Sequence, residues 1–188
     1  MNQNDVPYRY LSLTDDPLVE DWKSVINNIN SSFIYVDNEA NLLRQDVKTL
    51  FLECGMIPKR GNLWSREPYS FPPYHTDQKV NCELFAINWL LIGEPGLTEW
   101  SYQALNYKIE NNNLKPLHKI TSPQFWGDCY MKPDVTAVLN KPMMIKTNIP
   151  HRVNNENNST WRISYSLRFE GNPTWEEGIE KLKNFIIN

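Results

Sequence analysis

The segment Trp161-Arg162-Ile163-Ser164-Tyr165-Ser166-Leu167-Arg168-Phe169 alternates strictly between apolar and polar side chains. Successive side chains of a β-strand point to opposite faces, so one face of this strand is entirely apolar. The other face carries Arg162, Ser164, Ser166 and Arg168. An apolar face belongs in a core against a second layer, whereas an arginine and a hydroxyl two residues apart are suited to holding a carboxylate. The segment therefore predicts a strand that both supports the core and binds a ligand.

Upstream of this segment the chain has the texture of a β-rich domain. From about residue 64 onward, short aromatic and β-branched runs are separated by Pro, Asn and Gly. These runs predict strands at 68–75, 83–92, 98–107, 135–139, 142–147 and 161–169. Several short strands with turn signals between them favour a sandwich or a barrel.

Helical patterns are confined to the two ends of the chain. Apolar residues recur at helical spacing over 18–29 and again over 39–54, where Gly55 ends the run. A short strand is predicted at 32–36 between them, and Pro173 opens a last helix. We therefore predict an α+β, mainly β fold with a β-core and flanking helices.

The domain organisation follows from length and composition. The chain has 188 residues, of which 40% are hydrophobic, enough for one sizeable core. We predict a single domain, 1–188, with a helical flank at 1–63, a β-core at 64–170 and a C-terminal helix at 171–188.

Charge and hydropathy exclude some classes of partner. The formal net charge is -3, so there is no basic surplus to neutralise a phosphate backbone, which argues against nucleic acid. The most apolar stretch, 84–93, is far shorter than the roughly 20 residues of a membrane helix, and the first residues lack a leader pattern. We expect a soluble cytoplasmic protein that does not bind a membrane. Its oligomeric state is not predicted.

The cysteines show no metal or redox spacing. Cys54, Cys82 and Cys129 are an odd number, lie far apart and form no CxxC pair. We predict that they are reduced and mostly buried packing residues.

The histidines show a more specific arrangement. Only three exist, and His75 is followed two residues later by Asp77. On a strand these two side chains share a face and could bind one ion together. His151 follows a predicted strand far downstream, and the Arg162-x-Ser164 pair comes eleven residues after it. His118 has no partner at such a spacing, so we predict a surface or supporting residue.

This order of HxD, distal His and RxS resembles the Fe(II)- and 2-oxoglutarate-dependent dioxygenases over roughly residues 64–170. The family fold is a double-stranded β-helix, a cupin-like jelly roll. The resemblance implies that His75, Asp77 and His151 are the catalytic metal ligands, a two-histidine, one-carboxylate facial triad for iron. It also implies that Arg162 and Ser164 bind the distal carboxylate of 2-oxoglutarate. The glycines that often stand as a pair in the family are split here at 93 and 96.

The resemblance implies an iron oxygenase. Its cofactor would be Fe(II) and its co-substrates 2-oxoglutarate and O2, with oxidative decarboxylation to succinate coupled to hydroxylation. We expect the substrate to be a small molecule or an amino-acid side chain. Specificity resides in loops rather than in the metal motif, so the sequence does not identify this substrate.

Three more residues are candidates for binding the co-substrate, each with a structural alternative. Asn88 interrupts an apolar strand and could bind the C1 carboxylate or satisfy a structural hydrogen bond. Tyr102 could line the pocket or belong to the core. Arg168 resembles the second arginine in the RxNxTxR strand of alkylated-base demethylases, or it forms a strand-end salt bridge.

A group of basic residues, Lys59, Arg60 and Arg66, lies near Trp64 and Tyr69. It fits either a cavity mouth that attracts an anionic substrate or a solvated loop.

Three alternative functions remain open at this point. An alkylated nucleic-acid demethylase would need a basic groove and a nucleotide-flipping lid, and the charge balance argues against it. A non-catalytic, cupin-like binding or structural jelly roll would not need the intact HxD, His and RxS set. A non-iron metallohydrolase would give Arg162 and Ser164 no role.

Overall fold

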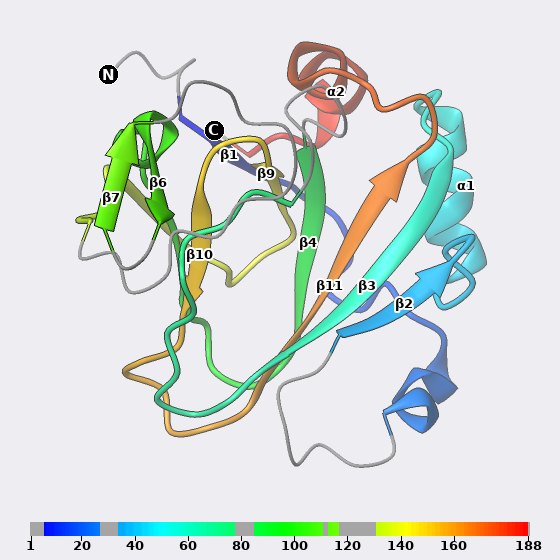
Figure 1. Ribbon diagram of the computed structural model, residues 1–188. Helices are drawn as coiled ribbons and strands as arrows, with labels where there is room; N and C mark the ends of the chain where they lie inside the picture. The colour runs from blue at the N-terminus through cyan, green and yellow to red at the C-terminus, as the bar shows by residue number, and fades with distance from the viewer. Residues whose placement is uncertain (1–5, 27–33, 78–84, 111–112, 117–130, 188) are drawn as a thin grey trace.

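The computed structural model describes residues 6–26, 34–77, 85–110, 113–116 and 131–187. Two antiparallel sheets form the centre of the molecule (Figure 1). The larger sheet has the order β1-β9-β4-β11-β3-β2. Its strands are β1 (Tyr8–Tyr10), β2 (Ile34–Asn38), β3 (Pro58–Arg66), β4 (Phe85–Ile92), β9 (Met143–Lys146) and β11 (Arg162–Phe169).

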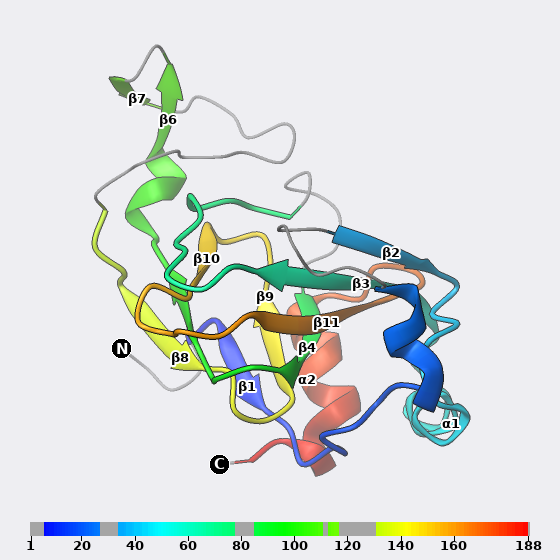
Figure 2. The same cartoon turned by 90° about the horizontal axis from the view of Figure 1, so that it is seen from below.

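The smaller sheet has the order β10-β5-β8. Its strands are β5 (Leu97–Trp100), β8 (Val135–Val138) and β10 (His151–Asn154). A hairpin of β6 (Tyr107–Glu110) and β7 (Asn113–Pro116) forms a separate two-stranded sheet, which projects away from the other two in Figure 2.

The strand order shows a jelly roll. His75 pairs with His151 as an isolated bridge, which adds the segment after β3 to the free edge of β10. Successive segments therefore alternate between the two sheets along the chain. β3, β4, β9 and β11 belong to the larger sheet. The His75 bridge, the pair β5 and β8, and then β10 belong to the smaller sheet and lie between them in chain order. Nested antiparallel pairs of this kind, divided between two facing sheets, are typical of the double-stranded β-helix. The fold prediction is confirmed.

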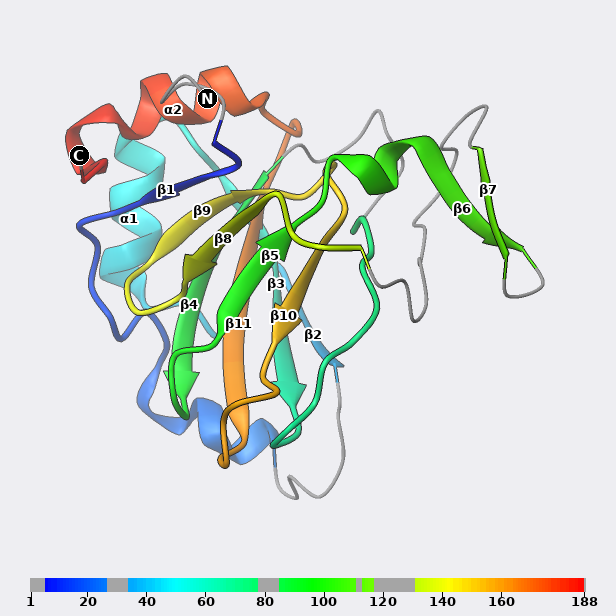
Figure 3. The ribbon, with the colours of Figure 1, turned by 90° about the vertical axis from the view of Figure 1, so that its left-hand side faces the viewer.

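Two helices cover the outer face of the larger sheet, α1 (Gln45–Glu53) and α2 (Trp175–Leu182). Figure 3 shows the helices on one side of this sheet and the smaller sheet on the other. The main apolar core lies between the helices and the sheet, and it includes Phe51, Ile163 and Tyr165. A second apolar cluster around Trp100 and Met143 lies between the two sheets. The apolar face of β11 therefore packs outward, and its polar face points into the barrel.

The N-terminal helices differ from the prediction. The predicted helix at 18–29 is a 3₁₀ helix at Glu20–Val25, because Val19 is extended and Leu18 forms a β-bridge with Leu43. Residues 27–29 lie outside the described part of the chain. The helix predicted from residue 39 begins at Gln45, because the two residues after β2 have positive φ angles.

The end of α1 and the C-terminal helix follow the predicted pattern. Gly55 adopts a φ of 68° after α1, as its position at the end of the run predicts. The helix predicted after Pro173 is α2, and Thr174 and Glu177 form a reciprocal capping box at its start.

One predicted strand was misplaced. The strand predicted at 68–75 contains only the His75 bridge, because three prolines interrupt it and Tyr69 has a positive φ angle. The strand in this region is β3, at 58–66, so the larger sheet extends into the predicted helical flank, which also contains β1 and β2.

The predicted strand at 98–107 ends at Trp100, and a 3₁₀ helix, Gln103–Asn106, follows it. β10 and the β6–β7 hairpin were not predicted. Cys54 is partly buried and is not in a disulfide, whereas Cys82 and Cys129 lie outside the described residues. In the described part of the chain, every helix is too short or too polar to cross a membrane.

Asp37 joins β2 to β11 and to the turn before α1. Its buried carboxylate accepts hydrogen bonds from Tyr165 Oη at 2.7 Å and from the amides of Asn41 and Leu42 at 2.8 and 3.0 Å. No side chain fits at Gly61, because a Cβ there would collide with the Tyr165 ring. The tyrosine can therefore reach Asp37 only because residue 61 is glycine.

We predict that Asp37→Ala destabilises the protein by about 2–4 kcal/mol, because three donors lose their acceptor in a buried place. Urea unfolding measures the change. Asp46→Ala is the matched control: this aspartate lies in an exposed pair with Arg44, so its loss should change the unfolding midpoint far less. Equal midpoints for the two variants would contradict the structural role of Asp37.

Candidate metal centre

The structure brings His75, Asp77 and His151 together at the edge of the smaller sheet. His75 Nε2 lies 3.3 Å from Asp77 Oδ1, and His151 Nε2 lies 3.5 Å from the same oxygen. One nitrogen or oxygen from each residue lies within 4.8 Å of the other two. Neighbouring ligands of an octahedral metal with bonds of about 2.1 Å are separated by roughly 3 Å. The three side chains therefore have the geometry to hold one metal ion.

The backbone fixes the two histidines relative to each other. His75 N donates to His151 O and His151 N donates to His75 O, both at 2.9 Å. This pair of hydrogen bonds makes the two residues direct neighbours, and their ring centroids are 4.8 Å apart. Asp77 continues the same segment, and its amide donates to Thr147 O at 3.2 Å.

Hydrogen bonds to the other ring nitrogen favour metal binding. His75 Nδ1 lies 3.3 Å from Pro73 O, and His151 Nδ1 lies 2.9 Å from Ile149 O. A carbonyl can only accept, so Nδ1 carries the proton and the Nε2 of a neutral ring keeps its lone pair. Both lone pairs then face a carboxylate oxygen, and a cation between the three acceptors satisfies them all.

Arg168 supports the carboxylate ligand. Its Nη2 donates to Asp77 Oδ2, and its Nη1 donates to Ser166 Oγ at 3.1 Å. This contact leaves Asp77 Oδ1 directed at the histidines. In the metal-free site burial raises the pKa of Asp77. The charge and hydrogen bond of His151 and the hydrogen bond of His75, made when their Nε2 carries a proton, together with the charge of Arg168 outweigh burial and hold that pKa well below its usual value. The carboxylate is therefore ionised at neutral pH, as a metal ligand must be.

A cavity opens beside the three candidate ligands, between the two sheets. Its polar lining includes Asn88 from β4, Thr98 from β5, and Ser164 and Ser166 from β11. Asn88 stands directly opposite Ser166, and its buried Oδ1 has no hydrogen-bond partner among the described residues. Predicted candidates Asn88 and Ser164 thus lie in the same cavity as His75, Asp77 and His151.

Arg162 lies at the other end of the polar face of β11 from Arg168. Its side chain is 1% exposed, and none of its three guanidinium nitrogens has a hydrogen-bond partner among the described residues. Burial, with a smaller contribution from nearby Arg66, lowers the pKa of Arg162 to about 10. The group remains a cation at neutral pH, and a buried cation without an anion is strongly unfavourable. Arg162 therefore indicates an anionic ligand.

Gly96, in the turn before β5, makes room for Arg162. A Cβ at residue 96 would lie 2.9 Å from Arg162 Nη1 and 2.9 Å from Asn154 O. One of the two split glycines thus has a physical role, since any larger residue would displace the guanidinium.

Arg152 anchors the segment that carries His75 from the outer side of the smaller sheet. Its guanidinium lies 4.2 Å from the ring centroids of both Phe71 and Tyr74. Its Nε donates to the buried Glu99 at 2.6 Å, and Asn154 Nδ2 donates to the same carboxylate at 2.9 Å. The segment before His75 is therefore held against β10 and β5 even though it forms no strand.

Some predicted residues lie elsewhere. Tyr102 is not in the cavity lining, and packs against the apolar cluster between the sheets, so the core alternative describes it. Tyr69 is 67% exposed. Arg168 is not in the cavity lining, but it contacts Asp77 and Ser166, which both line the cavity. His118 lies outside the described residues.

The sequence interpretation missed part of the cavity wall. Trp64 and Arg66 line the cavity from β3, and Ile145 and Val153 add apolar contacts. Arg66 therefore lies on a strand rather than in a solvated loop. The sequence did contain a signal for this strand, because its larger polar and aromatic residues alternate with small or apolar ones, as in β11. The first set is Arg60, Asn62, Trp64 and Arg66, and the second is Gly61, Leu63 and Ser65.

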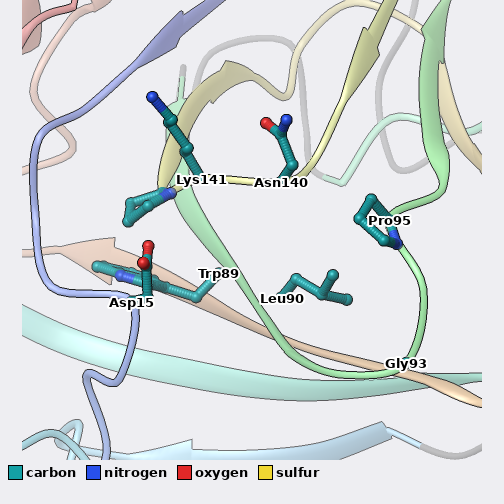
Figure 4. Close-up of a pocket in the computed structure, with 8 residues that line it drawn as sticks. Asp15, Trp89, Leu90, Gly93, Pro95, Asn140 and Lys141 are labelled. Atoms are coloured by element: carbon teal, nitrogen blue, oxygen red, sulfur yellow. The ribbon is translucent and has the colours of Figure 1, made fainter.

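A second pocket lies on the other side of β4 and is shown in Figure 4. Trp89, Leu90, Gly93 and Pro95 line it on one side, and Asn140, Lys141, Pro142 and Asp15 complete the wall. Its charged side chains, Asp15 and Lys141, are exposed. None of the predicted site residues belongs to it.

Comparisons with known proteins find distant structural similarity. No family model matches the chain, and no curated protein matches it. Among solved structures, a cupin domain from Bordetella pertussis Tohama I is similar at 13% identity, with 62% of this chain and 94% of that chain covered and a TM-score of 0.31.

Two further solved structures are similar. EvdMO1 shares 13% identity over 87% of this chain and 46% of its own, with a TM-score of 0.42. AviO1 from Streptomyces viridochromogenes Tue57 shares 11% over 69% of this chain and 60% of its own, with a TM-score of 0.35. Likenesses this distant carry no argument about function, and the jelly-roll assignment depends on the strand order of the chain itself.

We predict that His75→Ala and His151→Ala each weaken divalent metal binding by more than about 100-fold while the protein stays folded. Loss of a supporting partner alone costs roughly 10–100-fold, and loss of a ligand costs more. Titration of Co(II) followed by its visible absorbance measures the affinity. His118→Ala, the third histidine, is the matched control, and a loss of equal size there would contradict this assignment.

Proposed function

We propose that the protein is an Fe(II)- and 2-oxoglutarate-dependent dioxygenase that hydroxylates a small molecule or an amino-acid side chain. The observation that carries the proposal is the buried Arg162, a cation with no protein partner among the described residues, on the strand face that also borders the candidate metal ligands. A metal site alone would fit many activities. A metal site and a separate buried guanidinium together fit a ligand with one metal-chelating end and one free carboxylate.

The donor set fits iron. Two imidazoles and one carboxylate on one side of a metal leave the remaining positions to small ligands, as in non-haem Fe(II) oxygenases. Bound Fe(II) and 2-oxoglutarate would supply oxygen activation, with decarboxylation to succinate driving hydroxylation of a C–H bond. The chain itself positions the groups that take part and excludes water.

Residues at the two ends of β11 would have different roles in binding the co-substrate. Arg162 would form a charge-assisted pair with the distal carboxylate, and the Ser164 hydroxyl would donate a further hydrogen bond to it. At the other end, Arg168 holds Asp77 Oδ2 so that Oδ1 is free for the metal. Asn88 offers an amide near this end, suited to the C1 carboxylate.

The apolar part of the cavity wall would shield the reaction from solvent. Trp64, Ile145 and Val153 line the same cavity as the metal ligands. Apolar walls lower the local dielectric and strengthen the pairing of Arg162 with a carboxylate.

We predict that Arg162→Gln weakens 2-oxoglutarate binding by about 2–3 kcal/mol, or roughly 30–150-fold, because the charge-assisted pair is lost. The measurement is the charge-transfer absorbance of the anaerobic protein with Fe(II), titrated with 2-oxoglutarate. Metal affinity should stay unchanged, since Arg162 touches none of the three ligands.

Arg44→Gln serves as the matched control, because Arg44 pairs with Asp46 on the surface of α1. If iron binds but 2-oxoglutarate produces no band in the wild-type protein, the oxygenase proposal is wrong, and a non-catalytic binding jelly roll or a hydrolase takes its place.

We also predict that Gly96→Ala weakens 2-oxoglutarate binding without changing metal affinity. The new methyl group would lie 2.9 Å from both Arg162 Nη1 and the backbone oxygen of Asn154. The guanidinium is the more easily displaced of the two, because it is the end of a flexible side chain. The same titration measures the effect. Wild-type affinity in this variant would show that the position of Arg162 does not matter for the co-substrate.

A further inference from the structure

A second arginine accompanies Arg162 in the barrel. Arg66 on β3 stands directly opposite Arg162 on β11 in the antiparallel register. Residues opposite each other in such a pair project from the same face of the sheet. Arg66 lines the cavity that contains the candidate metal ligands, together with its neighbour Trp64.

Among the described residues, no carboxylate forms an ion pair with Arg66, and Asp77 acts on it only at longer range. The buried Nε of Arg66 has no hydrogen-bond partner among these residues either. Asp77 is the one carboxylate among the described residues of the cavity lining. That carboxylate is already engaged by Arg168 and faces both histidines.

Two neighbouring cations in a half-enclosed place are costly. Burial lowers the pKa of Arg66, and Arg66 in turn contributes to lowering that of Arg162. An arginine guanidinium keeps its positive charge at neutral pH in proteins. Adjacent buried cations are retained where a ligand brings negative charge to them.

The co-substrate does not supply enough negative charge for the whole cavity. Under the proposed function five positive charges lie in or beside the cavity. A divalent metal would contribute two, and Arg66 in the lining, Arg168 on Asp77 and the buried Arg162 contribute one each. Asp77 and the two carboxylates of 2-oxoglutarate carry three negative ones. The surplus is two positive charges. The metal would have Asp77 and the C1 carboxylate as ligands, Arg168 pairs with Asp77, and Arg162 would hold the distal carboxylate, so Arg66 is the guanidinium left without a carboxylate of its own.

We propose that Arg66 binds an anionic group, a carboxylate or a phosphate, of the substrate that is hydroxylated, so the substrate is an organic anion. This inference rests on the proposed function. Trp64 lies beside the guanidinium, with its ring centroid 5.8 Å from Arg66 Cζ, and gives a flat apolar surface to the carbon skeleton of the substrate. A carboxylate and a phosphate share the chemistry that Arg66 recognises.

The test is calorimetric titration of the protein loaded with Zn(II) and 2-oxoglutarate, a form that does not turn over. Acetate and benzoate are compared with their neutral counterparts acetamide and benzamide, and inorganic phosphate is titrated separately. The variants are Arg66→Gln, Arg66→Lys, Arg162→Gln and the surface control Arg44→Gln. The affinity of every variant for 2-oxoglutarate is measured first, which also shows that each is folded.

We expect the wild-type protein to bind at least one anion about tenfold or more tightly than its neutral counterpart. Arg66→Gln should lose this preference and lose much less 2-oxoglutarate affinity than Arg162→Gln does, whereas Arg66→Lys should keep part of the preference. A stronger response to phosphate than to the carboxylates would identify a phosphorylated substrate.

Two results would overturn the inference and leave the proposed function intact. One is an Arg66→Gln variant that loses 2-oxoglutarate affinity as severely as Arg162→Gln does, because both arginines would then hold the co-substrate. The other is a wild-type protein without any preference for anions. Failure of the wild-type protein to bind 2-oxoglutarate is a different result, and it would remove the proposed function itself.

Discussion

The alternation of β11 is the constraint on which the rest of the structure depends. β11 lies in the middle of the larger sheet, with helices on one side and the smaller sheet on the other, so both of its faces are covered (Figure 3). The apolar face packs against the helices, and the polar face must find partners inside the barrel. Arg168 forms an ion pair with Asp77, whereas Arg162 has no hydrogen-bond partner among the described residues. The candidate metal centre and the candidate anion site are therefore two ends of one strand face.

Period-two patterns allowed part of this arrangement to be predicted from the sequence. β11, β4 and β9 have apolar faces that a strand pattern reveals. The HxD and distal His spacing identified three residues that the structure brings together, and Ser164 of the RxS pair lines the same cavity. β3 was missed because its inward face is charged and its other face contains glycine and serine, so its segment has the composition of a loop. A strand whose polar face lines a cavity lacks the hydrophobic signal on which sequence interpretation depends.

Other errors have non-local causes. The start of α1 depends on Asp37, whose carboxylate accepts from the amides of residues 41 and 42 and keeps them out of a helix. That carboxylate is placed by β2 and by Tyr165, which is 128 residues away in the chain. Tyr102 could have faced the pocket if the strand predicted at 98–107 had continued past it. Because β5 ends at Trp100, the alternation of faces does not continue to it.

The backbone bridge between His75 and His151 has a mechanical consequence. The two imidazoles belong to segments that close one edge of the smaller sheet, and their mutual placement is fixed by main-chain hydrogen bonds rather than by the ion. An incoming metal would meet a preformed pair and lose little free energy in ordering it. Once bound, the metal would link two segments that are distant in the chain, because separating the His75 segment from β10 would also require breaking coordination bonds. Loading the metal would thus slow local opening at this edge, and amide exchange of the bridge would report it before global unfolding did.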